Sequence, residues 1–408
     1  MSLERFPRLL TSHLRALRHV TGHSGWFGLL IWMALFAAIE SAVGRPAQAA
    51  LELRVAIKEG VSQVAVGSSS KAIVRDSSGR SLGEIAPMNA FIAQPKQGSV
   101  ALDRWQSAQI WVEPTDGGYV YIGDRWYRGR TLVTPSKSGL VAVNYVDLEQ
   151  YLYSVLGGEM NGNWPQEALK AQAVAARSYA LYHRERAIAA SRPYDVVDTT
   201  ASQVYRGIQD ESTGTQMAVN ATASQVLAYG NRPIEAVFHS SAGGCTENSE
   251  DVWLNPVPYL KSVREGFQEV SPVAQWEIDI PRNELSKRIP GVGNIVAFEP
   301  VSITTCGRIK SMQVVGDRGR KTISGEALQT ALNLKSTLFN ILPPPALEAS
   351  KAKEQASPTM FQVIGRGFGH GLGLSQWGAY NLALGGNNYQ QILGLYYKNA
   401  SLGKIPNQ

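Results

Sequence analysis

The stretch Pro165–Arg186 reads PQEALKAQAVAARSYALYHRER and decides the fold of the chain. After its first residue it contains neither glycine nor proline, and it is rich in alanine and leucine, the strongest helix formers. Proline is tolerated at the start of a helix because its missing N–H would have no partner there. The alanines spread around the helix and leave no distinct polar face. We therefore predict a buried helix over Gln166–Arg186, close to neighbouring backbone.

The residues before this helix follow a β pattern. Apolar and polar residues alternate from Leu51 to about Ile122, and turn pairs such as Asp116-Gly117 separate the short runs. A second β stretch covers Leu132–Val146. We expect a small β-rich module at residues 50–124, followed by an α+β, β-rich domain at 125–408 around the central buried helix.

The residues after the helix mix strands with short helices. A short helix is expected at Gly325–Leu332, and a strand, a glycine-rich turn and one or two helices at Phe361–Gln408. Residues 343–358 are rich in proline, alanine and charged side chains, which favours a flexible loop.

The N-terminus has the order of an export signal. Arginines precede an apolar run from Trp26 to Ile39, and Ala47-Gln48-Ala49 follows as a cleavage motif. The run is short for a membrane span, which needs about 20 residues. We expect residues 1–49 to be a signal peptide, with an uncleaved membrane anchor as the alternative. Either one places the remaining chain outside the cytoplasm, in the periplasm or cell wall.

The charge and the cysteines leave several options open. A net charge of +6 suits an anionic partner but is equally typical of a basic soluble protein. No basic stripe or nucleic-acid motif is present, so we expect no nucleic-acid partner. Cys245 and Cys306 can form one disulfide, remain thiols or help to hold a metal.

Glu159 is the first candidate for chemistry. It follows Gly157-Gly158 and precedes Met160. A carboxyl group among glycines and apolar residues is poorly solvated, which raises its pKa. A general acid for glycosidic cleavage needs that environment.

Lys170 and Arg177 are the second candidates. About two turns separate them, so they share one face of the predicted helix. Cations on a buried helix are costly unless they meet carboxylates or line a polar cleft. They can balance the charge of the acid, bind anionic groups of a ligand, or lie on a solvent-exposed face of the helix.

The block Phe238–Trp253 gathers a histidine, a cysteine, hydroxyls and carboxylates around a Gly-Gly turn. His239 and Cys245 are weak candidates for a zinc site because the spacing matches no metal motif. A serine hydrolase is disfavoured because the chain has no GxSxG elbow.

The block Gly365–Ala379 has glycine at every second position in its first half. Such spacing lets the backbone approach a ligand or another segment closely. A dinucleotide-binding loop does not fit, because no βαβ unit surrounds it. His370, Gln376 and Trp377 are candidate sugar contacts.

Together these blocks resemble the family of stage II sporulation protein D and the amidase enhancer LytB. The resemblance covers about residue 125 to the end, in the order of the family. It rests on Val143–Leu152, Glu159-Met160, Trp164–Tyr179, Ser202–Gly207, Gly243–Trp253 and Gly369–Ala379.

The resemblance implies a peptidoglycan lytic transglycosylase, in which Glu159 matches the catalytic acid. No cofactor is expected apart from the weak zinc alternative. The expected substrate contacts are Lys170, Arg177, Tyr205, His239, Ser240, His370, Ser375 and Gln376.

One carboxyl group can act first as acid and then as base. Hydrolysis would ordinarily need a second carboxylate, for which Glu247, Glu250 and Asp251 are candidates. Because some relatives are enhancers of amidases, a non-catalytic wall-binding protein that stimulates an N-acetylmuramoyl-L-alanine amidase is the alternative.

Overall fold

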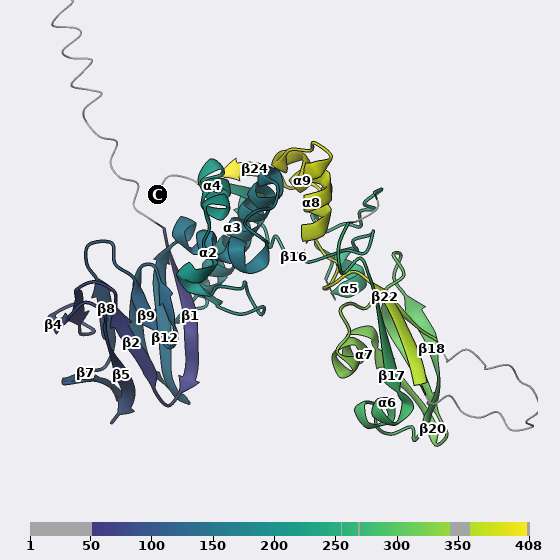
Figure 1. Ribbon diagram of the computed structural model, residues 1–408, viewed down its shortest axis with the longest axis horizontal. Helices are drawn as coiled ribbons and strands as arrows, with labels where there is room; N and C mark the ends of the chain where they lie inside the picture. The colour runs from purple at the N-terminus through teal and green to yellow at the C-terminus, as the bar shows by residue number, and fades with distance from the viewer. Residues whose placement is uncertain (1–50, 254, 268–269, 343–359, 406–408) are drawn as a thin grey trace, which may run out of the picture. The chain divides into compact units, whose positions relative to one another are not determined.

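A computed structural model describes residues 51–253, 255–267, 270–342 and 360–405 (Figure 1). The expected signal peptide at 1–49 and the expected loop at 343–358 lie outside these residues. Helices and several sheets mix along the chain, which confirms the α+β, β-rich class. Among the described residues no helix has the length and apolar character needed to cross a bilayer.

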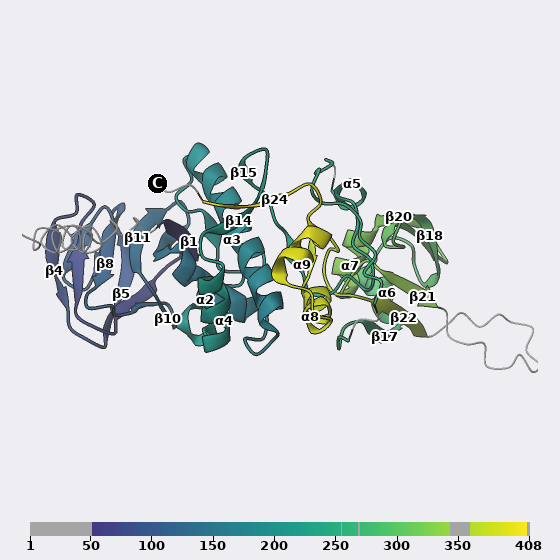
Figure 2. The same cartoon turned by 90° about the horizontal axis from the view of Figure 1, so that it is seen from above.

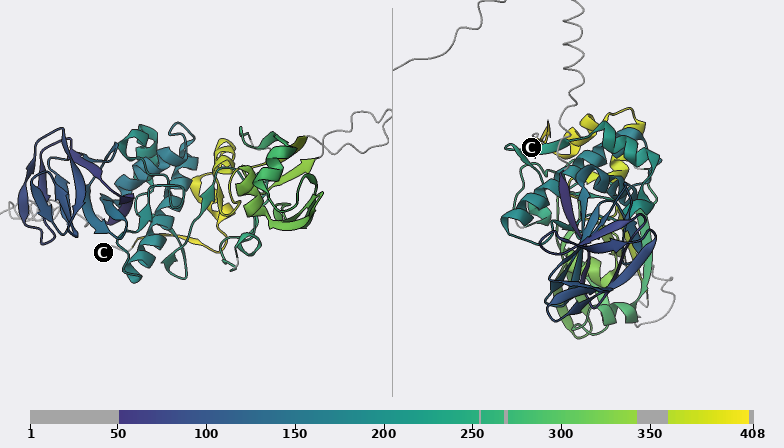
Figure 3. Two further views of the ribbon diagram at one scale, coloured as in Figure 1. Left: turned by 90° about the horizontal axis from the view of Figure 1, so that it is seen from below. Right: turned by 90° about the vertical axis from the view of Figure 1, so that its left-hand side faces the viewer.

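Two sheets form the first β region, drawn in purple and blue in Figures 1 and 3. One has the strand order β13 (Val196–Val197), β1 (Glu52–Val61), β12 (Gly139–Asp147), β11 (Arg130–Ser136), β8 (Ile110–Pro114), β3 (Ala72–Arg75) and β4 (Ser81–Ile85). The other has the order β10 (Arg125–Tyr127), β9 (Val120–Ile122), β2 (Val64–Ser68), β5 (Asn89–Lys96), β6 (Ser99–Leu102) and β7 (Trp105–Ser107).

The boundary that we expected at residue 124 lies inside this β region. It falls in the turn between β9 and β10, where Ile122 pairs with Arg125. The long strand β12, which we had assigned to the second domain, pairs with β1 along most of its length. The alternating pattern of the sequence identified the strands, but it could not say which strands share a sheet, because that depends on pairing between distant residues.

Helices α2 (Leu148–Glu159), α3 (Gln166–Ala189) and α4 (Thr213–Ala221) pack against one another (Figure 2). The predicted start of α3 is confirmed, and its end lies a little beyond Arg186. Its alanines from Ala168 to Ala187 are buried on all sides, as expected from a helix without a polar face. Asp147 caps α2 by accepting a hydrogen bond from the Gln150 N–H.

A second hydrophobic core includes Trp276, Phe339 and Phe361. Two three-stranded sheets surround it with helices α6 (Arg282–Arg288) and α7 (Gly325–Leu332), and the latter confirms the predicted short helix. The first sheet has the order β17 (Gln275–Pro281), β22 (Met360–Arg366), β21 (Phe339–Leu342), and the second β18 (Ile295–Ile303), β19 (Ile309–Gly316), β20 (Gly319–Ser324).

The C-terminal segment returns to α3. Helices α8 (Gln376–Leu384) and α9 (Tyr389–Tyr396) both contact α3, as Figure 2 shows. Strand β24 (Ser401–Lys404) pairs with β14 (Gln225–Tyr229), whose other neighbour is β15 (Arg232–Pro233). The short strands β16 (Phe238–His239) and β23 (Leu374–Ser375) run parallel and bring the two loop-rich blocks together. The remaining helices among the described residues are α5 (Ser249–Val252) and the 3-10 turn η1 (Gly207–Asp210).

Candidate active site

Glu159 is the last residue of α2, and two glycines bring the opposing chain close to it. A Cβ atom on Gly157 would lie 1.8 Å from the Asp210 carbonyl oxygen. A Cβ atom on Gly158 would lie 2.8 Å from the Val204 carbonyl oxygen. Any larger residue would therefore push this segment away. With glycine in place, the Val204 N–H donates a hydrogen bond of 2.9 Å to Glu159 Oε1.

Burial controls the protonation of Glu159. Loss of water around the carboxyl group raises its pKa above the ordinary value. The Val204 N–H, the Gln376 amide at 3.4 Å from Oε2 and the charge of Arg206 oppose this shift without cancelling it. Glu159 thus holds its proton more tightly than an exposed glutamate, as a general acid requires.

A pocket of about 470 Å³ opens beside Glu159. Among the described residues that line it, Glu159 carries the sole carboxylate. The others supply hydroxyl groups, aromatic rings, imidazoles and one amide. They are Tyr179, Thr200, Ser202, Val237, Phe238, His239, Ser240, Phe368, Gly369, His370 and Gln376.

Two histidines form one wall of the pocket, with ring centroids 5.3 Å apart. His239 is buried, and its Nδ1 lies 3.0 Å from the Leu372 carbonyl oxygen, to which it can donate. This assignment leaves Nε2 as an acceptor without a hydrogen-bond partner among the described residues. Burial, together with His370 and Arg308, lowers the pKa of His239 well below its ordinary value.

His370 has an exposed edge, but both ring nitrogens face the protein. Nδ1 accepts from the Leu372 N–H at 3.0 Å, and Nε2 lies 3.1 Å from the Phe238 carbonyl oxygen. Desolvation of these atoms and the charge of Arg308 lower the pKa of His370 to about 4. Both imidazoles are therefore neutral at neutral pH.

The alternating glycines allow close approach, as the sequence predicted, and the segment approached is that of His239. Gly369 has φ +109°, and a Cβ there would lie 2.7 Å from the His239 Cβ. Gly373 has φ +66°, and a Cβ would lie 2.1 Å from the Val237 carbonyl oxygen. Side chains at these positions would strain the backbone and separate the walls of the pocket.

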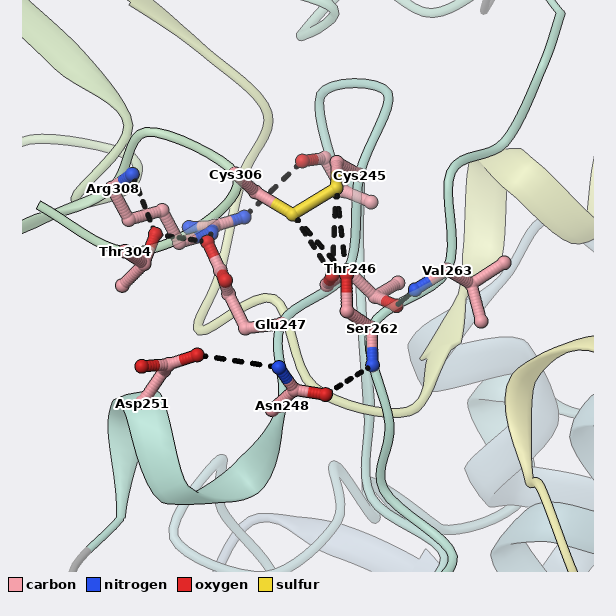
Figure 4. The surroundings of a disulfide bond; sticks show 11 residues. Cys245, Thr246, Glu247, Asn248, Asp251, Ser262, Val263, Thr304, Cys306 and Arg308 are labelled. Carbon is pink, nitrogen blue, oxygen red and sulfur yellow. Dashed lines mark hydrogen bonds and ion pairs between the residues drawn. A yellow bond between two sulfur atoms is a disulfide. The ribbon is translucent and has the colours of Figure 1, made fainter.

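A disulfide joins Cys245 to Cys306 and closes the chain between them into a loop (Figure 4). Beside it, buried Glu247 accepts a hydrogen bond from Thr304 and lies 3.7 Å from the Arg308 guanidinium. Arg308 also donates to the carbonyl oxygens of Ala242 and Gly369, so it ties both histidine-bearing loops together. Burial lowers the pKa of Arg308 to about 10, which still leaves it charged at neutral pH.

The two weak candidates for zinc, His239 and Cys245, have other partners in this structure. The Cys245 sulfur is bonded to Cys306 and is not available as a thiolate ligand. His239 directs Nδ1 to a carbonyl oxygen. Among the described residues no cluster of three or more histidines, cysteines and carboxylates could hold a metal.

The candidates for a second carboxylate also lie outside the pocket lining. Glu247 is in the buried network with Arg308, Glu250 pairs with Lys261, and Asp251 pairs with Lys310. The carboxylates near the Gly-Gly turn hold the loop together instead of facing Glu159.

The two candidate cations of α3, Lys170 and Arg177, do not line the pocket either. Lys170 pairs with Glu167 at 2.6 Å. Arg177 is wholly buried, binds both carboxylate oxygens of Glu149 and donates to the Gln225 carbonyl oxygen. The expectation that these cations contact substrate is not supported by their positions, because their charges are satisfied within the protein. Arg177 instead joins α3 to α2 and β14.

Tyr205 and Ser375 have structural contacts as well. Tyr205 is buried between two tyrosine rings and donates to the Asn144 side chain at 2.8 Å. Ser375 caps α8 and accepts from the Ala242 N–H. Of the expected contacts, the structure brings His239, Ser240, His370 and Gln376 to the Glu159 pocket. Trp377 packs against Trp164 and Tyr380 instead of lining the pocket.

Seven pocket residues were missed as site candidates: Tyr179, Thr200, Ser202, Val237, Phe238, Phe368 and Gly369. Tyr179 and Ser202 lie within the quoted motifs, so the motif positions were a usable signal. Burial raises the pKa of Tyr179 to about 12, which keeps its hydroxyl protonated. Phe368 stands between two glycines with 46% of its surface exposed, an unusual position for a phenylalanine.

Comparison with known proteins shows the family to which this chain belongs. A family model described as Stage II sporulation protein matches residues 136–229, which contain Glu159, Tyr179 and Ser202. Stage II sporulation protein D of Bacillus subtilis is 30% identical over 64% of this chain and 76% of its own length. The chain belongs to the stage II sporulation protein D family. That family was expected from the motifs, and its central motif is the part that carries Glu159.

Other relatives extend the comparison. An uncharacterized protein of Brachyspira hyodysenteriae is 32% identical over 71% of this chain and 75% of its own length. The amidase enhancer of Bacillus subtilis is 29% identical over 62% of this chain and 40% of its own length. Residues 267–373 match a domain of unknown function, which contains Phe368 and His370. The pocket therefore takes residues from both matched regions and from the segments beside them.

Proposed function

We propose that this protein is an exported lytic transglycosylase of the bacterial cell wall. It cleaves the bond between N-acetylmuramic acid and N-acetylglucosamine in peptidoglycan glycan strands. The observation that carries the proposal is the Glu159 carboxyl group at the side of a polar pocket, where burial raises its pKa above the ordinary value. Membership of a family that includes stage II sporulation protein D supports a role at the wall.

In the first step protonated Glu159 gives its proton to the glycosidic oxygen, and the bond from the muramyl C1 to that oxygen breaks. The N-acetylglucosamine product leaves with a new hydroxyl group. Glu159, now a carboxylate, takes the proton of the muramyl 6-hydroxyl as that oxygen attacks C1. The products are an anhydromuramyl end and a protonated Glu159, so the enzyme is restored without water.

The pocket composition favours this route over hydrolysis. A hydrolase of the common kind uses two carboxyl groups across the scissile bond. Among the described lining residues Glu159 is the only carboxyl group, which matches a single group acting as acid and then base. The Val204 N–H and the Gln376 amide stabilise the carboxylate form between the two steps.

Neutral groups in the pocket suit the uncharged hydroxyl and acetamido groups of a sugar ring. The unpartnered Nε2 of His239 is an acceptor beside the cavity, and the Tyr179 hydroxyl remains a donor because its pKa is raised to about 12. Exposed Phe368 offers an apolar face to a sugar ring. The Cys245–Cys306 disulfide supports the exported location, because disulfides persist in oxidising compartments.

Mass spectrometry of digested glycan strands tests the proposal. Purified protein is incubated with peptide-bearing and peptide-free strands, in parallel with Glu159→Gln. We expect anhydromuramyl ends from the native protein alone. Reducing ends would indicate hydrolysis.

The similarity to an amidase enhancer supports a second candidate function, in which the protein binds the wall and stimulates an N-acetylmuramoyl-L-alanine amidase. Under this alternative the protein cleaves no strand, but the rate of an added amidase rises equally with native protein and with Glu159→Gln. The same incubations, repeated with amidase present, separate the two candidates.

A further inference from the structure

The segment from Ile364 to His370 alternates between exposed and shielded residues. Ile364, Arg366, Phe368 and His370 are exposed, whereas the three glycines between them are buried or half-buried. The glycines meet protein: a Cβ on Gly365 would collide with Trp276, and one on Gly367 with the Ser241 carbonyl oxygen. One side of this segment is thus packed, and the other is a row of four large side chains.

This row connects two pockets. Phe368 and His370 line the pocket of Glu159. Ile364 and Arg366 line a second pocket of about 480 Å³, together with Ile303 and Phe339. The seven residues span at most about 20 Å. The two pockets are therefore lined in part by the same short segment of the chain.

The row carries an apolar ring and an unpaired cation. Phe368 is 46% exposed and Ile364 is 39% exposed. Within the part of the chain that the structure describes, Arg366 forms no ion pair and its side chain makes no hydrogen bond. Arg320, by contrast, is an exposed arginine that pairs with an acidic side chain, that of Glu299. A guanidinium with free donors beside an exposed aromatic ring suits a ligand that has both rings and carboxylates.

We propose that the row is an extended binding track for the glycan strand, with Phe368 against a sugar ring and Arg366 paired to a muramyl carboxylate. The inference rests on the proposed function and identifies residues that select the substrate. N-acetylmuramic acid differs from N-acetylglucosamine in a lactyl group. Its carboxylate is free in peptide-free strands, and it is replaced by the carboxylates of the stem peptide in intact ones. Both sources offer the same chemistry to Arg366.

Binding is measured by calorimetry in a Glu159→Gln background, so that no strand is cleaved. The ligands are peptide-free strands, peptide-bearing strands and a neutral N-acetylglucosamine oligomer. We expect Arg366→Gln to weaken binding of a carboxylate-bearing strand about fivefold, in the range of one partly exposed ion pair. Arg366→Lys should restore part of the loss. The neutral oligomer should be unaffected, whereas Phe368→Ala should weaken binding of all three ligands.

The identity of the strand that responds to Arg366→Gln distinguishes the free lactyl carboxylate from the stem peptide. Arg320→Gln, which removes an exposed cation that lines neither pocket, is the matched control. The inference is overturned if Arg366→Gln binds every ligand as the parent does, or if the control loses as much affinity. If the native protein cleaves strands but Arg366→Gln binds them as tightly as the parent does, the binding track is rejected and the proposed function is retained. Failure of the parent to bind any glycan, with no cleavage, would reject the proposed function as well.

Discussion

The side-chain amide of Gln376 lies 3.4 Å from Oε2 of Glu159, although 217 positions separate the two residues in the chain. Gln376 begins α8 and Glu159 ends α2. The parallel pairing of β16 with β23 places the start of α8 at the pocket. The amide nitrogen can only donate, so this contact favours the ionised form of Glu159 and opposes the effect of burial.

Replacement of Gln376 should therefore change the pH profile. In Gln376→Leu the donor is lost, and the pKa of Glu159 rises further. Because the protonated carboxyl group is the acid of the proposed mechanism, the alkaline limb of kcat/KM should move to higher pH, while the maximal rate falls. A pH–rate profile of both proteins checks this. A lower rate without a shift of the alkaline limb of the pH–rate profile would mean that Gln376 only positions the substrate.

Replacement of Glu159 should abolish cleavage and change how stability depends on pH. Glu159→Gln should lower the rate by about 10²–10⁴-fold, the usual contribution of a general acid. Between its ordinary pKa and the raised one, the folded protein binds more protons than the unfolded chain, so ionisation of Glu159 makes the protein less stable as pH rises.

The Gln variant has no titrating group at position 159, so it does not lose this contribution as pH rises. Its stability relative to the native protein should therefore increase from pH 4 to pH 7. Urea unfolding at both values measures the difference. Equal differences at the two pH values would contradict a raised pKa in the folded state.

Arg177 should act on stability and not on ligand binding. Its buried guanidinium holds Glu149 and the Gln225 carbonyl oxygen. Arg177→Ala leaves these groups without their partner and should cost about 3 kcal/mol of unfolding free energy. Thermal unfolding measures this cost, and Lys170→Ala, which breaks a half-exposed pair, is the control at under about 1 kcal/mol. A raised KM in a fully folded Arg177→Lys protein would restore a role in binding.

The disulfide should stabilise the fold without holding a metal. Its closed loop spans 61 residues, for which loop entropy gives about 4 kcal/mol. Cys245→Ser with Cys306→Ser should lower the melting temperature, and a reductant should lower that of the native protein but not that of the variant. Elemental analysis of the native protein should find no stoichiometric zinc. One zinc per chain, lost in the cysteine variant, would reverse our assignment.

The sequence determined the features that depend on local chemistry. Alanine-rich composition without glycine or proline was sufficient to predict the buried helix α3, because helix propensity and burial act within one segment. The glycines beside Glu159 indicated a poorly solvated carboxyl group, and the alternating glycines after Gly365 indicated a close approach. The motifs around these positions identified the family, which the comparisons confirm.

The tertiary structure decided which polar groups line the pocket and which contact one another. Lys170, Arg177 and Glu247 carry charges in motifs beside the site, and pattern alone cannot tell an internal ion pair from a ligand contact. Their partners Glu167, Glu149 and Arg308 were fixed only when distant elements packed together. A charge that is buried on folding needs an oppositely charged partner within the protein, because leaving it unpaired is costly. A neutral group beside a cavity has no such requirement.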